Sequence, residues 1–320
     1  MTGCPAERRH PKRHVRNRKA IPLCLTLLAS SCQLWAQEKG PAPPSFSVTS
    51  NLVRLLVTVR DQATGAIVTN LNKDDFHVSD DSVEQTISIF ERNTSVPLSI
   101  ALLVDTSGST NKDIAYETAS ILKFLHALKQ AGNPNDALAV YSFNWQVKME
   151  LGYTRNEQRA ERVMRQMHGE GGTSLYDAIY LVSNDLADRD GRHVLLVVTD
   201  GGDTTSYKKF EDAVKAAIRS EAVLYPIVVV PIESDAGRNL GGEHALETMA
   251  QATGGRTFYP AGTGELDRAF TEILHELRTE YLLGYYPRLP RALTNAYHAV
   301  QVTVRRPELK AITRSGYYAQ

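Results

Sequence analysis

The sequence predicts an α/β fold in which a doubly wound, mostly parallel sheet carries helices on both faces, with a small β-rich flanking region. Three observations lead to this prediction. Apolar runs at residues 97–105, 193–200 and 222–230 have the continuous hydrophobicity of strands that are covered on both faces. Segments with helical spacing of apolar residues separate these runs, as in sheets built from right-handed crossovers. Residues before 95 and after 280 instead show the two-residue alternation of half-buried strands.

The elements of the central part follow one another in a regular order. In the first helix, Ile121, Leu125 and Leu128 recur at spacings of three and four residues. Strands are expected at residues 97–105, 136–143, 193–200 and 222–230, with short ones at 146–151 and 255–259. Helices are expected at residues 112–130, 156–168, 175–188, 207–220, 243–253 and 264–279. Residues 95–280 are therefore predicted to form one α/β domain.

The two β-rich flanks lie at residues 46–94 and 281–320. The first flank contains NLVRLLVTVRD, FHVSDD and QTISIFE, which predict three or four strands separated by turns. The second contains YLLGYYP, YHAVQVTV and AITRSGYY. We expect the two flanks to pack together, because the ends of a domain's chain often lie close to each other.

The N-terminus has the layout of a secretory signal. Residues 1–36 hold seven Lys/Arg and one acidic residue, and a short apolar stretch leads to Ala36 at a plausible cleavage point. The apolar stretch is too short to span a bilayer, and no later segment resembles a transmembrane helix. A disordered basic tail is the alternative interpretation. We predict a signal peptide at 1–36, a proline-rich linker at 37–45, and a periplasmic, cell-surface or secreted protein.

All three cysteines, Cys4, Cys24 and Cys32, lie in this leader. A chain cut after Ala36 would have no disulfide, no thiolate zinc site and no cysteine nucleophile. Cleavage before Cys32 followed by lipidation of that residue is an alternative, which would tether the chain to a membrane. The formal net charge of the whole chain is zero, so no overall field favours nucleic acid as a partner.

Oxygen-bearing side chains follow the buried strands of the predicted sheet. Asp105 and Asp200 stand at the ends of two strands, Ser107 and Ser109 follow Asp105, and Thr173 precedes a helix. The carboxyl ends of the strands in a doubly wound sheet form its usual ligand site, so these five side chains could converge there. Carboxylates and hydroxyls are the hard donors that small dications prefer. The pattern predicts a metal site for Mg²⁺, with Mn²⁺ or Ca²⁺ as alternatives.

These residues also have plainer structural interpretations. Asp105, Ser107 and Ser109 could simply cap a helix. The GEGGTS loop at 169–174 lacks the lysine of a phosphate-binding loop, and neither HExxH nor GxSxG occurs in the chain. His168 and His193 are interpreted as ordinary loop or strand-edge residues, Asp203 as a turn residue, and Asp177 as a charge in a helix's first turn. No nucleophile or general base stands out, so we expect no enzyme activity.

The three motifs also carry a family resemblance. DTSGS at 105–109, the threonine of GGTS at 173 and TDGGD at 199–203 resemble the metal-ion-dependent adhesion site of von Willebrand factor type A domains, which have a Rossmann-like fold. The resemblance covers about residues 95–280, and the flanks are similar to those of a bacterial exported group of related proteins. It implies that Ser107, Ser109 and Thr173 contact the ion through their hydroxyls.

The same resemblance implies a role for the two aspartates and for the protein. Asp105 and Asp200 would act on the ion directly or through water, and an acidic side chain of a protein ligand would take the open coordination position. The expected function is therefore an exported, adhesion-type binding module. The alternatives are a scaffold subunit of an envelope complex or a metal-assisted hydrolase.

Overall fold

The computed structural model describes residues 52–92, 96–110, 114–131, 133–229, 239–288 and 295–319. The predicted signal peptide at 1–36 and linker at 37–45 lie outside the described residues. The chain divides into two compact units, Met1–Val48 and Thr49–Gln320, and the fold below is that of the second unit. None of its described helices is long and apolar enough to cross a membrane.

The central sheet has five strands in the order β7-β6-β5-β8-β9, and only β7 runs antiparallel to its neighbour. The strands are β5 (Leu98–Asp105), β6 (Ala137–Phe143), β7 (Val147–Thr154), β8 (Arg192–Thr199) and β9 (Val223–Val228). The strand expected at 255–259 is reduced to one bridge between Phe258 and Ile227. Pro260, which has no N–H to donate, follows two residues later and prevents a longer ladder.

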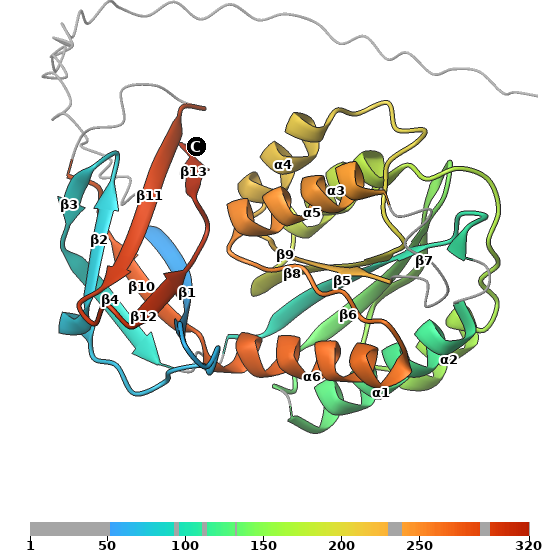
Figure 1. The fold of residues 1–320 in the computed structure, drawn as a ribbon, viewed down its shortest axis with the longest axis horizontal. Coiled ribbons are helices and arrows are strands. Elements are labelled where there is room, and N and C mark those ends of the chain that lie inside the picture. The colour runs from blue at the N-terminus through green and yellow to red at the C-terminus, as the bar shows by residue number, and fades with distance from the viewer. Residues whose placement is uncertain are drawn as a thin grey trace, which may run out of the picture. The chain divides into compact units, whose positions relative to one another are not determined.

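Helices cover both faces of this sheet, so the predicted doubly wound α/β architecture is confirmed. They are α1 (Ile114–Ala131), α2 (Glu157–Met164), α3 (Leu175–Ala187), α4 (Phe210–Arg219), α5 (Leu240–Thr253) and α6 (Thr263–Thr279). Helices α1, α2 and α6 lie on one face and α3, α4 and α5 on the other, each set over its own apolar core (Figure 1). Helix α4 begins at 210 rather than 207. Lys209 has the extended backbone of an N-cap residue, and its N–H donates to the Asp212 carboxylate at 3.2 Å. The N–H groups of Tyr207 and Lys208, in the loop before it, donate to the Asp177 carboxylate.

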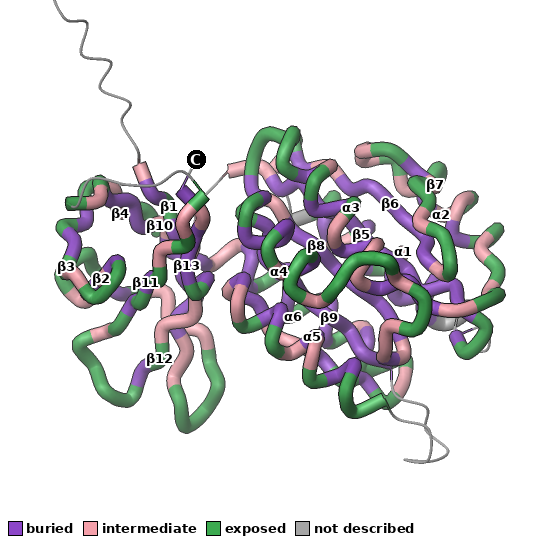
Figure 2. Tube along the Cα trace, turned by 90° about the horizontal axis from the view of Figure 1, so that it is seen from above, coloured by how far each residue is buried: buried purple, intermediate pink, exposed green. Residues whose placement is uncertain are grey.

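Strand β5 is the point at which the strand order reverses. It pairs in parallel with β6 on one side and with β8 on the other. Both β5 and β8 are buried along almost their whole length (Figure 2), as expected of strands covered on two faces. The carboxyl ends of β5 and β8 therefore meet at the position where doubly wound sheets bind ligands.

The flanks form two four-stranded antiparallel sheets that share one apolar core. Each sheet combines strands from before and after the central domain, in the orders β12-β1-β10-β4 and β13-β11-β2-β3. The strands are β1 (Val53–Asp61), β2 (Phe76–Asp80), β3 (Val83–Gln85), β4 (Ile87–Arg92), β10 (Tyr281–Tyr285), β11 (Tyr297–Val304), β12 (Leu309–Ile312) and β13 (Gly316–Tyr318), and a 3₁₀ turn, η1 (Lys73–Asp75), precedes β2. Strand β10 follows directly on α6, so the last helix of the central domain leads into the middle of a flanking sheet.

Candidate metal centre

The first loop of the candidate centre begins where β5 ends. Asp105 is its last residue, and the Ser107 N–H donates to Asp105 Oδ1 at 2.8 Å, which folds the chain back on itself. The Thr110 hydroxyl donates to the Asp105 carbonyl at 3.0 Å and closes the turn. The hydroxyl oxygens of Ser107 and Ser109 lie 3.1 Å apart. Asp105 and Ser107 are buried and Ser109 is exposed, so this loop offers oxygens from the core outward to the surface.

The second loop, between α2 and α3, carries Thr173 and is bound to the first. The Glu170 N–H donates to the Thr106 carbonyl at 2.8 Å, and the Gly108 N–H donates to the Gly171 carbonyl at 3.1 Å. Thr173 itself is buried. The loop that holds Ser107 and Ser109 is therefore fixed against the loop that holds Thr173 by backbone bonds in both directions.

The third loop follows β8 and carries Asp200. The Thr199 hydroxyl donates to Asp105 Oδ2 at 2.6 Å, which ties this loop to the first. Thr204 ties it to the second, because the Thr173 N–H donates to the Thr204 hydroxyl at 2.8 Å and the Thr204 N–H donates to the Thr173 carbonyl at 2.8 Å. Each loop is thus bonded to the other two, and all five predicted residues belong to this one assembly at the carboxyl edge of the sheet.

Two carboxylates, Asp105 and Asp200, place negative charge at the centre. Burial, with a smaller contribution from the charge of Asp200, raises the pKa of Asp105 from 3.8 to about 6, against the opposing hydrogen bonds from Thr199 and Ser107. Among the described residues, no lysine, arginine or histidine forms an ion pair with Asp105 or Asp200. A bound cation would supply the missing charge.

The donor set fits a small hard dication. An octahedral ion with metal–oxygen distances of about 2.0–2.1 Å places neighbouring ligand oxygens about 3 Å apart. The 3.1 Å separation of the Ser107 and Ser109 hydroxyls matches that spacing. Hydroxyl ligands carry no charge, so an ion held by them keeps much of its own charge for a further anionic ligand.

A second cluster of potential metal ligands, Asp80, Asp81 and His298, lies in the flanking sheets. Its geometry suits a hydrogen-bonded pair better than an ion. His298 Nδ1 lies 2.8 Å from Asp81 Oδ2, and Nε2 is buried with no hydrogen-bond partner among the described residues. A metal on Nδ1 would force the ring proton onto Nε2, where it would find no acceptor, whereas metal-bound histidines normally donate that proton.

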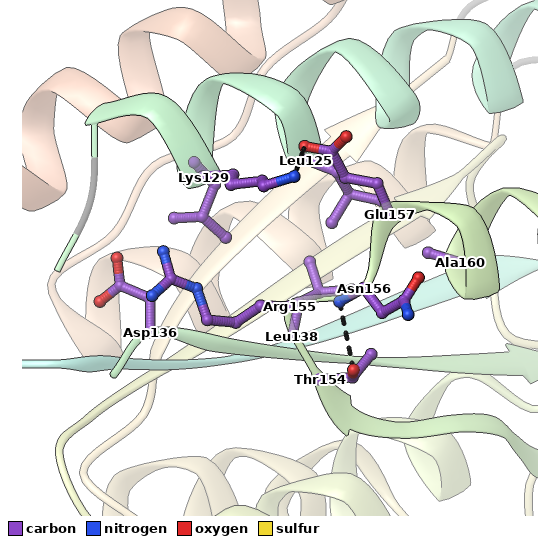
Figure 3. Close-up of a pocket in the computed structure, with 10 residues that line it drawn as sticks. Leu125, Lys129, Asp136, Leu138, Thr154, Arg155, Asn156, Glu157 and Ala160 are labelled. Carbon is purple, nitrogen blue, oxygen red and sulfur yellow. Dashed lines mark hydrogen bonds and ion pairs between the residues drawn. The ribbon is translucent and has the colours of Figure 1, made fainter. Parts of the chain in front are cut away.

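A small cavity beside α1 and the start of α2 is also unsuited to a ligand. Figure 3 shows Leu125, Lys129 and Glu157 at its edge, with Lys129 and Glu157 3.8 Å apart. Its volume of about 20 Å³ has room for one water molecule and little more.

Three residues that support the centre were not assigned a role from sequence. Thr199 and Thr204 bond to Asp105 and Thr173, and Trp145, which is 54% exposed, packs against Gly171 of the second loop. Thr199 and Thr204 stand in or beside the TDGGD motif, which is the only signal for them. Trp145 follows β6, and nothing in the sequence of that strand indicates that Trp145 contacts the second loop.

The other residues singled out in the sequence have structural partners. Asp203 accepts hydrogen bonds from the Ser206 hydroxyl and, at 3.3 Å, from the Tyr176 N–H. Asp177 lies in the first turn of α3, as predicted. His193 contacts the carbonyls of Ser220 and Arg189, at 2.5 and 2.8 Å. His168 lies 2.5 Å from the Gln166 carbonyl.

Comparison with solved structures returns von Willebrand factor type A domains at low sequence identity. One is the von Willebrand factor domain of the type V pili tip protein Mfa5 from Porphyromonas gingivalis (12% identity, TM-score 0.46, 57% of this chain and 95% of that chain). Another is the PilB minor pilin of Streptococcus sanguinis (12% identity, TM-score 0.44, 58% and 62%). A third is a von Willebrand factor type A protein from Catenulispora acidiphila (10% identity, TM-score 0.46, 86% and 76%).

The sequence comparisons are more decisive. No curated protein sequence matches this chain. The family model of the von Willebrand factor type A domain matches residues 99–272, which is more than half of the chain and includes all three loops of the candidate centre. The chain therefore belongs to the von Willebrand factor type A domain family.

Proposed function

We propose that this protein is an exported binding module that holds a divalent cation between Asp105, Ser107, Ser109, Thr173 and Asp200. The observation that carries the proposal is the mutual hydrogen bonding of the three loops, which gathers two carboxylates and three hydroxyls at one edge of the sheet. Mg²⁺ is the expected ion, and Mn²⁺ or Ca²⁺ could replace it. The ion would attract and orient a carboxylate of the ligand.

The ligand is proposed to be a protein that offers an acidic side chain. The exposed surface near the three loops supports a protein partner. Trp145 and Tyr207 present large exposed aromatic side chains there, and Leu240, the first residue of α5, is also exposed. Exposed apolar and aromatic side chains are typical of protein interfaces. Export is supported by the basic leader and its apolar stretch, and Cys32 offers a lipid tether as the alternative to a free mature chain.

The proposal is a binding role and not an enzymatic one. A metal-assisted hydrolase would need a general base beside the ion. The hydrogen-bond partners described for Asp105 and Thr173 are hydroxyls and backbone groups, which are poor bases. A scaffold subunit of an envelope complex remains the second candidate, and co-purification with a fixed partner irrespective of metal would identify it.

Calorimetric titration of Mg²⁺ and Mn²⁺ into the full chain tests the metal centre. We expect saturable binding to one site in the wild type and its loss in Asp105→Ala. Asp188→Ala is the matched control, since it removes an exposed carboxylate at the end of α3. Circular dichroism checks that both variants are folded. Unchanged metal affinity in a folded Asp105→Ala variant would show that the ion is not held by these residues.

A further inference from the structure

A cleft of about 730 Å³ lies at the amino end of β8, at the end of the strand opposite the candidate metal centre. Leu56 of β1 and Leu282 of β10 line it from the flanking sheet, and Ile218 lines it from α4. Ligand pockets in proteins commonly enclose about 300–1,000 Å³, so the cleft is large enough for a few residues of a peptide.

The walls of this cleft are strongly basic. Five arginines and His193 line it, against only Asp190 and Glu221 on the acidic side. Arg192 is buried and paired with Glu280, and Arg314 lies 3.1 Å from Glu221. These two arginines are therefore neutralised within the protein, and the positive excess comes from the other three.

Arg54, Arg189 and Arg219 supply that excess, and all three are exposed. The Arg54 guanidinium lies 4.0 Å from the Glu221 carboxylate, which is also the partner of Arg314. The Arg189 guanidinium lies over the Tyr153 ring, 4.3 Å from its centroid, and Arg219 donates to the neutral amide of Asn295. Within the described residues, no carboxylate lies at ion-pair distance from Arg189 or Arg219. Their guanidinium forks can each take a carboxylate in the bidentate geometry that arginine favours.

The strand that borders the cleft has an open edge. Strand β10 pairs with β1 along Val53–Val57, but β12 pairs with β1 only from Thr58 to Asp61. In the described part of the chain, no strand covers the β12 side of β1 before Thr58. The carbonyl of Arg54 is bound there by the Arg314 guanidinium at 2.9 Å, a side chain in the place of a neighbouring strand. An exposed strand edge can accept an extended peptide as an added strand.

We propose that this cleft is a second binding site, which takes an extended acidic segment of a partner polypeptide. The segment's backbone would pair with the open edge of β1, and its carboxylates would bind the guanidinium groups of Arg54, Arg189 and Arg219. Arg54 and Leu56 lie two residues apart on β1 and share one face, so the acidic residues of the segment would lie on the face of the cleft and the residues between them on the opposite face. The site does not use the metal centre, so the protein could hold two acidic partners at opposite ends of its central sheet.

Fluorescence anisotropy tests this site on the full chain, with a labelled peptide of alternating glutamate and valine as the probe. Binding is expected to weaken at least about tenfold in Arg189→Glu and in Arg219→Glu, and to remain unchanged in Arg268→Glu, which makes the same charge change on the exposed face of α6. A peptide with glutamine in place of glutamate should bind at least about tenfold more weakly, and so should one N-methylated at alternate residues. A chelator should have no effect.

Four results would overturn the proposal. Equal losses in Arg268→Glu would show a general charge effect without a site. Equal binding of the glutamine peptide would show that the arginines do not read carboxylates. Unchanged binding of the N-methylated peptide would show that the strand edge is not used. Loss of peptide binding with chelator would instead place the probe at the metal centre.

Discussion

The Thr199 hydroxyl donates a 2.6 Å hydrogen bond to Asp105 Oδ2, across the two adjacent strands whose ends form the candidate metal centre. Both residues are almost wholly buried. The bond holds the carboxylate in one orientation, and together with the Ser107 N–H on the other oxygen it stabilises the charged form of Asp105. Thr199 is therefore a positioning residue for the centre, although it is not among the five proposed ligands.

Thr199→Val tests this role. The valine has nearly the shape of threonine but cannot donate, so we expect the protein to stay folded and its Mg²⁺ affinity to fall by about tenfold, the usual effect of losing an outer-shell partner. Thr199→Ser, which keeps the hydroxyl, should retain most of the affinity. Calorimetry on both variants makes the comparison. Equal affinities for the valine and serine variants would show that the hydroxyl does not position Asp105.

Asp105 should make the stability of the metal-free protein depend on pH. Its pKa is raised from 3.8 to about 6 by burial, so the folded state disfavours the ionised form. This contribution to stability is fully present below about pH 4 and is lost as the pH rises through about 6, by about 3 kcal/mol in the limit. Asp105→Asn removes the titrating group and keeps an acceptor for the Ser107 N–H. We therefore expect the variant to be more stable than the wild type at pH 8, and the difference to shrink towards pH 5.

Urea denaturation of the metal-free proteins at these two pH values measures the difference. Excess Mg²⁺ should reverse the order at pH 8, since it can stabilise only the form that binds it. Protons and metal compete for the same carboxylate, so the Mg²⁺ affinity of the wild type should also fall as the pH drops below about 6. A constant difference between the two proteins from pH 5 to pH 8 would contradict the raised pKa.

Gly171→Ala should disturb the second loop of the centre. Gly171 has φ +75°, a left-handed conformation that alanine adopts at a cost, and an added Cβ would come within 2.5 Å of the Trp145 ring. We expect a loss of about 1–2 kcal/mol in the free energy of unfolding and a displacement of Trp145. Gly264→Ala is the control, because Gly264 lies in α6 with open space around it, where alanine should be neutral or stabilising.

The fluorescence of Trp145 reports the displacement directly. The chain has two tryptophans, Trp35 and Trp145, so a Trp35→Phe background leaves Trp145 as the only emitter. Its emission should shift in Gly171→Ala and not in Gly264→Ala. An unchanged spectrum together with unchanged stability would mean that Trp145 does not pack on this loop in solution.

The architecture was predictable because its signals are local and strong. Leu98–Asp105 is buried at every position and reads as a continuous apolar run, and the intervening helices repeat apolar residues with helical spacing. The start of α4 was not predicted correctly, and it involves a contact between residues far apart in the chain. Residues 207–209 continue a polar helical pattern, but α4 begins only after Lys209, and Asp177, thirty residues away in the chain, binds the N–H groups of Tyr207 and Lys208 in the loop before it. A bond of that kind leaves no trace in the pattern of residues.

The site was predictable as a set of donors but not as an assembly. Asp105, Ser107, Ser109, Thr173 and Asp200 follow from strand ends, hard-donor chemistry and a family resemblance. The bonds of Thr199 and Thr204 depend on the pairing of β5 with β8 and on the path of two loops, which spacing does not specify. The basic cleft was invisible in the sequence, because its arginines are distributed from Arg54 to Arg314 and the net charge of the chain is zero.

Asp80 should be critical to the flanking sheets. It is buried, and its Oδ2 accepts hydrogen bonds from the Tyr285 hydroxyl at 2.9 Å and the Tyr317 hydroxyl at 2.6 Å. These tyrosines belong to different sheets, so the carboxylate joins both sheets, and it joins a strand that precedes the central domain to two strands that follow it. Asp80→Leu would remove the acceptor that two buried phenols share, and we expect it to reduce the free energy of unfolding by about 2–4 kcal/mol. Asp80→Asn, which keeps one acceptor oxygen, should lose about 1 kcal/mol.

Thermal unfolding of the two variants separates loss of the acceptor from loss of charge. Near-ultraviolet circular dichroism should show altered tyrosine signals in Asp80→Leu, and Mg²⁺ affinity should stay at the wild-type value in both variants, because Asp80 belongs to the flanking sheets and not to the central sheet that carries the metal centre. If Asp80→Leu were as stable as the wild type, the phenols would have another acceptor and the two sheets would not depend on this carboxylate. If instead both variants lost stability equally, the negative charge of Asp80 would be the essential feature and not its capacity to accept.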